Sequence, residues 1–246
     1  MNIIDYIIIG VLLLSALVGF KKGIINSIVT FVGTIIVIIL AFYLKNPVSN
    51  LFYDYIPFLN LFGKFSGVQT FNILVIEGLS YAVTLAIIST ILGVIAKVTG
   101  VVGRLLNSGL ILGIPSRIGG LICGVLEGVV VSFIIVFLLS TISSTSELVN
   151  KSSYADTLLT KTPILSSYIK DTYNGVNEVY TICINYEKEK DKTEANAESL
   201  RVLLKYNIIT PKSAEKLVNN KKLTFTGASD IINDYRKETQ NDWISK

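Results

Sequence analysis

A five-residue segment, Gly19-Phe20-Lys21-Lys22-Gly23, constrains the fold of this chain more than any other. It separates two apolar runs, Ile3 to Val18 and Ile24 to Leu44. As α-helices rising about 1.5 Å per residue, these runs would span roughly 24 Å and 31 Å, against a hydrocarbon core of about 30 Å. Because two adjacent lysines in hydrocarbon would cost several kcal/mol, the chain must leave the membrane here and return at once. The segment, called the hairpin below, therefore predicts a turn between two membrane helices.

Composition and two further apolar runs extend this prediction. Of the 246 residues, 51% are hydrophobic and only 16% are charged. Runs at 73–96 and 118–142 are also long enough to cross a bilayer. Asn46-Pro47 ends the second run, since proline cannot continue a helix, and the aromatic-rich stretch 51–65 is typical of the membrane–water interface. The sequence predicts an all-α fold, a polytopic membrane protein with about four transmembrane helices and a mostly helical C-terminal tail.

The orientation of these helices follows from the basic residues of the loops. The loops after the first and third runs hold Lys21, Lys22, Lys97, Arg104 and Arg117. The loop after the second run holds Lys45 and Lys64, and Lys151 and Lys161 behind the fourth run favour the opposite orientation. Short loops rich in lysine and arginine stay in the cytoplasm. We therefore expect a multi-pass membrane protein with its tail outside the cytoplasm.

The chain divides by composition into four parts. We expect a four-helix transmembrane region at 1–145 and an amphipathic helical extension at 146–186, interrupted by Pro163 and Gly175. A charged, solvated linker follows at 187–198, and a small helical module at 199–246. Within the module, Thr210-Pro211 has the pattern of an N-cap followed by proline at the first helical position.

Several classes of function are disfavoured by residue content. The chain has no histidine, and Cys123 and Cys183 fall in different regions, so we expect no metal site, no disulfide and no cofactor. No pattern of residues suits catalysis, and we expect that the protein is not an enzyme. Acidic and basic residues are nearly balanced in the tail, which disfavours a nucleic-acid partner.

The fourth apolar run carries a packing signal. Gly120, Gly124 and Gly128 recur at every fourth position and would line one face of a helix. Such faces allow two membrane helices to approach closely. We expect a helix–helix contact, either within the chain or between copies; the alternative is that glycine is simply frequent in membrane helices.

Two acidic residues lie in or near the apolar runs. Glu127 is beside Gly124 and Gly128 in the fourth run, and Glu77 is about one turn inside the third. A carboxylate inside a membrane is costly and suggests a functional site, either for a proton or cation or paired with Arg117 or Arg104. The alternative is that each helix begins nearer its acid, so that the carboxylate reaches water at the headgroups.

These features resemble the colicin V production protein family of bacterial membrane proteins. The matching residues are Asp5, the Gly-aromatic-basic-basic-Gly pattern of the hairpin, and the glycine-rich stretch 107–128, which contains Gly119-Gly120-Leu121-Ile122-Cys123-Gly124-Val125-Leu126-Glu127-Gly128. The resemblance covers roughly residues 1–165. Glu127 departs from it, since relatives tend to place a basic residue there.

The resemblance implies a bacterial inner-membrane location and a role in toxin or bacteriocin production or export and in envelope homeostasis. It supplies no catalytic residues. We expect a membrane protein that works through assembly, with the lipid bilayer, further copies of itself or other membrane proteins as partners. The alternative function is a small oligomeric channel or transporter in which Glu127 and Glu77 line a polar path.

Overall fold

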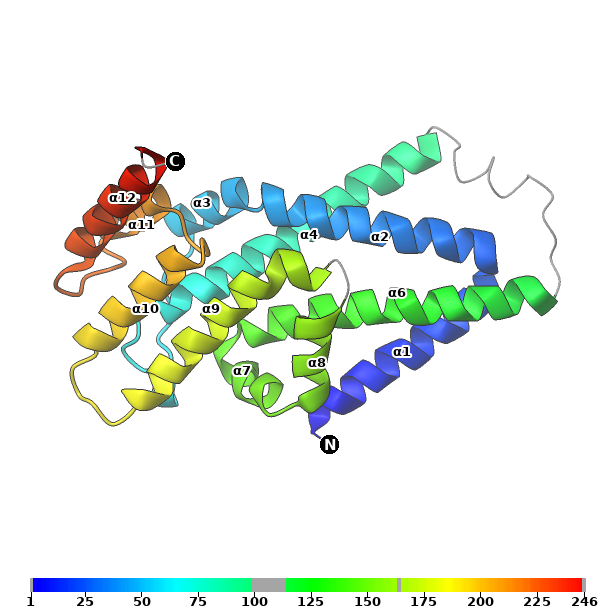
Figure 1. Cartoon of the computed structure of the whole chain (residues 1–246), viewed down its shortest axis with the longest axis horizontal. Helices are drawn as coiled ribbons and strands as arrows, with labels where there is room; N and C mark the ends of the chain where they lie inside the picture. Colours follow the sequence, from blue (N-terminus) through cyan, green and yellow to red (C-terminus); the bar gives the residue numbers. More distant parts are fainter. Residues whose placement is uncertain (1, 99–113, 163–164, 245–246) are drawn as a thin grey trace. The chain divides into compact units, whose positions relative to one another are not determined.

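The computed structural model describes residues 2–98, 114–162 and 165–244, and in these ranges every regular element is helical. Figure 1 shows the order of the elements along the chain. Their bounds are α1 Ile3–Lys22, α2 Ile24–Leu44, α3 Asn46–Tyr55, the short 3-10 helix Gly63–Phe65, α4 Phe71–Val98, α6 Ile114–Ser140, α7 Ser143–Asn150, α8 Ser153–Lys161, α9 Leu165–Asn185, α10 Thr193–Lys205, α11 Pro211–Asn219 and α12 Ala228–Ile244.

Four stretches of this fold are long and apolar enough to cross a membrane, which confirms the predicted fold class. They are Ile3–Lys22, Ile24–Tyr55, Phe71–Ile95 and Ile114–Ser140. The last begins at Ile114 rather than at Ile118, because Pro115 fits the first helical turn, where its missing N–H costs nothing. Residues 99–113 of the loop after the third apolar run, which contain Arg104, lie outside the described residues.

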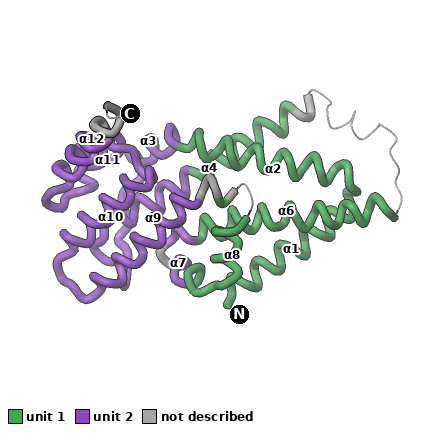
Figure 2. The backbone as a smooth tube through the Cα atoms, viewed as in Figure 1, with its two compact units in different colours: residues 1–45, 81–139, 148–168 green, residues 46–80, 140–147, 169–246 purple. Residues whose placement is uncertain are grey.

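The chain folds into two compact units, coloured separately in Figure 2. The first comprises 1–45, 81–139 and 148–168, and is called the membrane unit below. The second comprises 46–80, 140–147 and 169–246, and is called the tail unit. The tail unit therefore combines the C-terminal segments with α3, the aromatic stretch and the first turns of α4, which lie far from them in the sequence.

The membrane unit has a small apolar core and many exposed apolar side chains. Tyr81 and Phe137 pack edge to face with ring centroids 5.7 Å apart, and the Tyr81 hydroxyl donates to the Ile38 carbonyl oxygen at 3.3 Å. Exposed leucine, isoleucine and valine side chains recur along α1, α2, α6 and the second half of α4. Such a surface is unfavourable in water and suits contact with lipid tails.

The N-terminal end of α1 is held by polar contacts within the membrane unit. Asn2 and Asp5 form a capping box, and the Asn2 amide also donates to the Leu148 carbonyl oxygen at 2.5 Å. The Ser152 hydroxyl donates to the buried Asp5 carboxylate and accepts from the Ala155 N–H at the start of α8. Asp5 therefore joins the first turns of α1 and α8.

In the tail unit, α9 to α12 pack around the start of α4 and around α3. Its core contains Tyr53, Phe71, Leu74, Val179, Cys183, Leu200, Leu203, Leu217 and Ile232. Gly175 lies inside α9 and does not interrupt it, contrary to the sequence-based expectation. A Cβ at Gly175 would come within 2.6 Å of Ile208 Cδ1, so this glycine serves close packing.

The start of α10 differs from the predicted solvated linker at 187–198. The helix begins at Thr193, whose N–H and hydroxyl both donate to the Asp191 carboxylate, at 2.9 Å and 2.7 Å. Ala195, Asn196 and Ala197 are buried. The prediction is wrong from Thr193 onward because small residues and a satisfied amide can enter a core despite the charges beside them.

Asn196 makes four hydrogen bonds within the tail unit. Its amide donates to the carbonyl oxygens of Gly67, at 3.0 Å, and Lys192, at 2.8 Å. Its side-chain oxygen accepts from the N–H and the hydroxyl of Thr70, at 3.1 Å and 3.3 Å. One side chain from α10 therefore satisfies the backbone just before α4.

Candidate functional site in the membrane unit

A glycine seam joins α1 to α6 in the membrane unit. A Cβ built on Gly19 would lie 2.2 Å from the Gly120 carbonyl oxygen, and one on Gly120 would lie 2.3 Å from the Gly19 carbonyl oxygen. On Gly124 it would meet the Ser15 carbonyl oxygen at 2.4 Å, and on Gly128 the Ser15 Cβ at 2.9 Å. The structure thus places the predicted glycine face against α1 of the same chain, backbone to backbone.

The hairpin and the start of α6 lie at the same end of this unit. Gly23 has φ 77°, which L-residues with side chains rarely adopt, and its N–H donates to the Gly19 carbonyl oxygen at 3.0 Å. The N–H of Ile24 donates to the Ser116 hydroxyl at 3.3 Å. Because Arg117 follows Ser116, the lysines of the hairpin and Arg117 share one end of the unit.

Glu127 lies at the midpoint of α6, next to the glycine seam. At about 1.5 Å per residue, each end of the helix is about 20 Å away, so α6 does not begin near this carboxylate. Arg117 is about 15 Å away along the same helix axis. The structure therefore does not pair Glu127 with Arg117, and Arg104 lies outside the described residues.

The partner of Glu127 is a hydroxyl of α2. The Thr30 Oγ1 atom lies 3.2 Å from Glu127 Oε2 and 3.1 Å from the Ser27 carbonyl oxygen, so its proton is shared between two acceptors. The Ser27 hydroxyl donates to the Gly19 carbonyl oxygen at 3.3 Å, and the Thr34 hydroxyl to the Thr30 carbonyl oxygen at 2.9 Å. We call Ser27, Thr30, Thr34 and Glu127 the polar line.

Sequence reasoning missed the three hydroxyl residues of the polar line. Serine and threonine are tolerated in apolar helices because they bond to their own backbone, so they attract little attention. Their spacing was the available signal, since Ser27, Thr30 and Thr34 recur at intervals of three and four and share one helix face.

Glu77 lies elsewhere, in the core of the tail unit. The Tyr53 hydroxyl donates to its Oε1 atom at 2.7 Å, and both residues are buried. Glu77 thus stabilises the packing of α3 on α4. The two acids that the sequence suggested for one polar path belong to different compact units.

The sequence of the chain matches one protein-family model. The family model described as colicin V production protein matches residues 4–163. The chain belongs to this family. No curated protein and no solved structure matches the chain.

The family match ends just before α9 and therefore covers the glycine seam, the hairpin and Glu127. Most of the tail unit lies beyond it. The match also covers residues 46–80 and 140–147 of the tail unit, whereas α10, α11 and α12 are outside the matched region.

Metal and thiol chemistry find little support in the described part of the chain. No group of three Cys, Asp or Glu side chains there is close enough to hold a metal ion. Cys183 is fully buried in α9, and burial raises the pKa of its thiol to about 12, so it is unreactive at neutral pH. Cys123 is a half-buried residue of α6.

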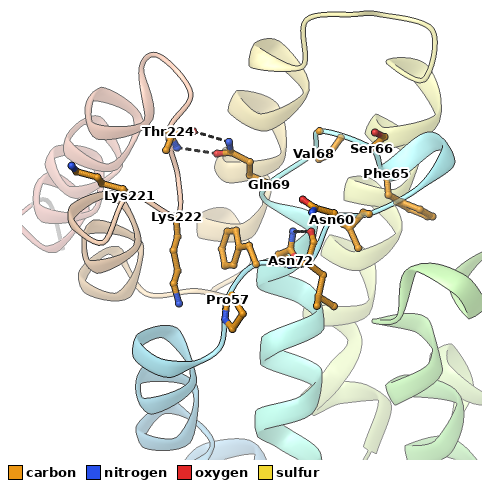
Figure 3. A pocket seen from close by; sticks show the side chains of 14 residues that line it. Pro57, Asn60, Phe65, Ser66, Val68, Gln69, Asn72, Lys221, Lys222 and Thr224 are labelled. Carbon is orange, nitrogen blue, oxygen red and sulfur yellow. Dashed lines mark hydrogen bonds between the residues drawn. The ribbon is translucent and has the colours of Figure 1, made fainter.

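The tail unit contains an open pocket of about 670 Å³ beside the aromatic stretch. Figure 3 shows two pairs of hydrogen bonds at its wall. Gln69 bonds the N–H and hydroxyl of Thr224 at 2.9 Å and 2.7 Å, and Asn72 bonds the backbone of Leu59. These two amides are therefore occupied in joining segments of the tail unit.

Proposed function

We propose that this member of the colicin V production family supports toxin or bacteriocin production or export, and envelope homeostasis, as a non-enzymatic assembly protein of a bacterial inner membrane. The observation that carries the proposal is the family match over residues 4–163. The glycine seam supports it, because close backbone contact between α1 and α6 holds these two membrane helices together.

The partners that we propose are the lipid bilayer, other copies of the chain and other membrane proteins. The seam is occupied within the chain, so a neighbouring protein would contact the outer apolar surface of α1, α2, α4 or α6. Crosslinking in native membranes followed by mass determination tests this directly. Recovery of the monomer alone, at crosslinker doses that capture a known membrane complex, contradicts the assembly role.

A genetic experiment tests the physiological part of the proposal. Deletion of the gene that encodes this chain should reduce bacteriocin secretion by the host and increase its sensitivity to envelope stress. Wild-type protein should restore both, whereas a Gly120→Leu variant with a disrupted seam should restore neither. Unchanged secretion and stress resistance in the deletion strain would exclude the role.

We also propose that the end of the membrane unit bearing the hairpin lysines and Arg117 faces the cytoplasm, with the tail outside. Clustered basic residues favour this side. A reporter that is active only outside the cytoplasm, fused after Lys246, should be active. Activity confined to a fusion near Lys22 reverses the orientation.

The second candidate function is a small oligomeric channel or transporter. The observation that favours it is the polar line, which places Glu127 at the midpoint of a membrane helix with a hydroxyl partner. A carboxylate at that depth is unusual unless it binds a proton or a cation.

Ion flux into vesicles containing the purified protein separates the two candidates. For a channel, Glu127→Gln and Thr30→Val should both reduce the flux. Thr90→Val is the matched control, because the Thr90 hydroxyl donates to the Ala86 carbonyl oxygen of its own helix, at 2.8 Å. A stable complex without flux favours assembly, and flux that is indifferent to Glu127 rejects the polar line as its path.

A further inference from the structure

The tail unit exposes an apolar segment that its own core does not need. Within residues 55–62, called the anchor loop below, Tyr55 is 78% exposed, Leu59 55% and Phe62 86%. The six aromatic residues of the stretch 51–65 do not behave alike, since Tyr53 and Phe65 are buried in the core. The exposed apolar side chains of this segment are therefore Tyr55, Leu59 and Phe62.

The anchor loop has two faces. Phe58 and Leu61 pack against the core of the tail unit, whereas their neighbours Leu59 and Phe62 point away from it. Leu59 and Phe62 are therefore exposed although the loop that carries them is packed against the core. Two large apolar side chains that stay in water gain no hydrophobic stabilisation from folding, so an apolar environment outside the chain is expected to receive them.

Hydrogen bonds from both sides hold the anchor loop in shape. The Leu59 N–H donates to Asn72 Oδ1 at 2.8 Å, and Asn72 Nδ2 donates to the Leu59 carbonyl oxygen at 3.2 Å. Lys222 Nζ donates to the carbonyl oxygens of Tyr53, at 2.7 Å, and Ile56, at 2.6 Å, which caps the end of α3. Figure 3 shows Asn72 and Lys222 on either side of the loop.

Chain connectivity identifies the environment. Tyr55 is the last residue of the candidate membrane span Ile24–Tyr55, and the next span begins at Phe71. A short loop that joins two consecutive candidate spans stays close to the side of the bilayer on which the first of them ends. Tyrosine and other amphipathic aromatic residues are enriched at this level of membranes.

We propose that Tyr55, Leu59 and Phe62 insert into the interfacial layer of the lipid bilayer and attach the tail unit to it. The phenyl ring of Phe62 and the Leu59 side chain lie among the first acyl carbons, and the Tyr55 hydroxyl remains with the headgroups. This attachment does not depend on the proposed role in secretion.

Tryptophan fluorescence in vesicles tests the proposal. The chain has one tryptophan, Trp243, so Trp243→Phe provides a silent background. Phe62→Trp is introduced into the full-length chain, with Arg201→Trp on the exposed side of α10 as the matched control. Both are reconstituted into phosphatidylcholine vesicles with and without lipid brominated near the headgroup.

The expected result is strong quenching of the Phe62→Trp signal by brominated lipid and several-fold protection from aqueous acrylamide. The Arg201→Trp signal should show the opposite behaviour. Leu59→Trp should reproduce the result for Phe62→Trp, which keeps the test valid if one substitution disturbs the loop.

Two outcomes overturn the proposal. If acrylamide quenches the Phe62→Trp and Arg201→Trp signals equally and brominated lipid affects neither, the anchor loop faces water. If the Phe62→Trp signal is protected from both quenchers, a second copy or another protein covers the loop.

Discussion

Substitution of Gly124 by alanine gives the sharpest test of the glycine seam. The new Cβ would lie 2.4 Å from the Ser15 carbonyl oxygen, and real Cβ atoms essentially never approach a heavy atom closer than 3.0 Å. The helices α1 and α6 must therefore separate locally by at least 0.6 Å, the difference of these two distances. The obstacle is backbone, which cannot rotate away as a side chain can.

The expected loss of unfolding free energy follows from this overlap. Overpacking of a close contact costs about 1–3 kcal/mol, but alanine also gains roughly 0.5–1 kcal/mol over glycine inside a helix. Gly33→Ala in α2 receives the same gain without the clash, because nothing lies within 4 Å of its Cβ. Gly124→Ala should consequently be less stable than Gly33→Ala by about 1–3 kcal/mol.

The comparison requires the free energy of unfolding of the purified chain. Titration with sodium dodecyl sulfate in mixed micelles, followed by circular dichroism, supplies it for both variants. Equal unfolding midpoints for Gly124→Ala and Gly33→Ala would show that α1 and α6 are not in backbone contact. That result would refute the glycine seam.

Further predictions concern the tail unit. Asn196→Ala should cost roughly 2–4 kcal/mol of unfolding free energy in the same titration, because it leaves buried backbone groups without partners, while the exposed Asn233→Ala should be neutral. The hydrogen bond from Arg236 lowers the pKa of Glu215, so its stabilisation is present above the usual carboxyl pKa of about 4.3 and is lost as the pH falls through the lower folded value. The stability difference between wild type and Glu215→Gln should therefore shrink on acidification; a constant difference contradicts the pairing. In a chain with no other cysteine, the Cys183 thiol should react with a maleimide only as fast as the tail unit opens, and rapid labelling at neutral pH would refute its burial.

Much of the membrane unit could be predicted from local patterns. A lysine pair between two long apolar runs permits no arrangement other than a turn at the membrane surface, and glycines at every fourth position share a helix face by geometry alone. The polar line was harder, since Thr30 looks unremarkable in the sequence. Its importance depends on α2 lying beside α6, which no local pattern records.

The tail unit was predicted least well. Its core joins α3 and the start of α4 to segments more than a hundred residues later, through pairs such as Thr70 with Asn196 and Lys216 with Asp54. Charges around 187–198 suggested a solvated linker, yet Asn196 is buried with every bond satisfied. A buried amide is recognisable only when its partners are known.

The sequence by itself determined that this chain is helical, that it carries four membrane-spanning stretches and that it turns at the hairpin, because hydrophobicity and unpaired charge act locally and strongly. Tertiary structure alone decided that the glycine face meets α1, that Glu127 meets Thr30 while Glu77 enters another core, and which aromatic residues stay exposed. Those outcomes depend on contacts between distant segments, whose free energies become visible only once the helices are packed.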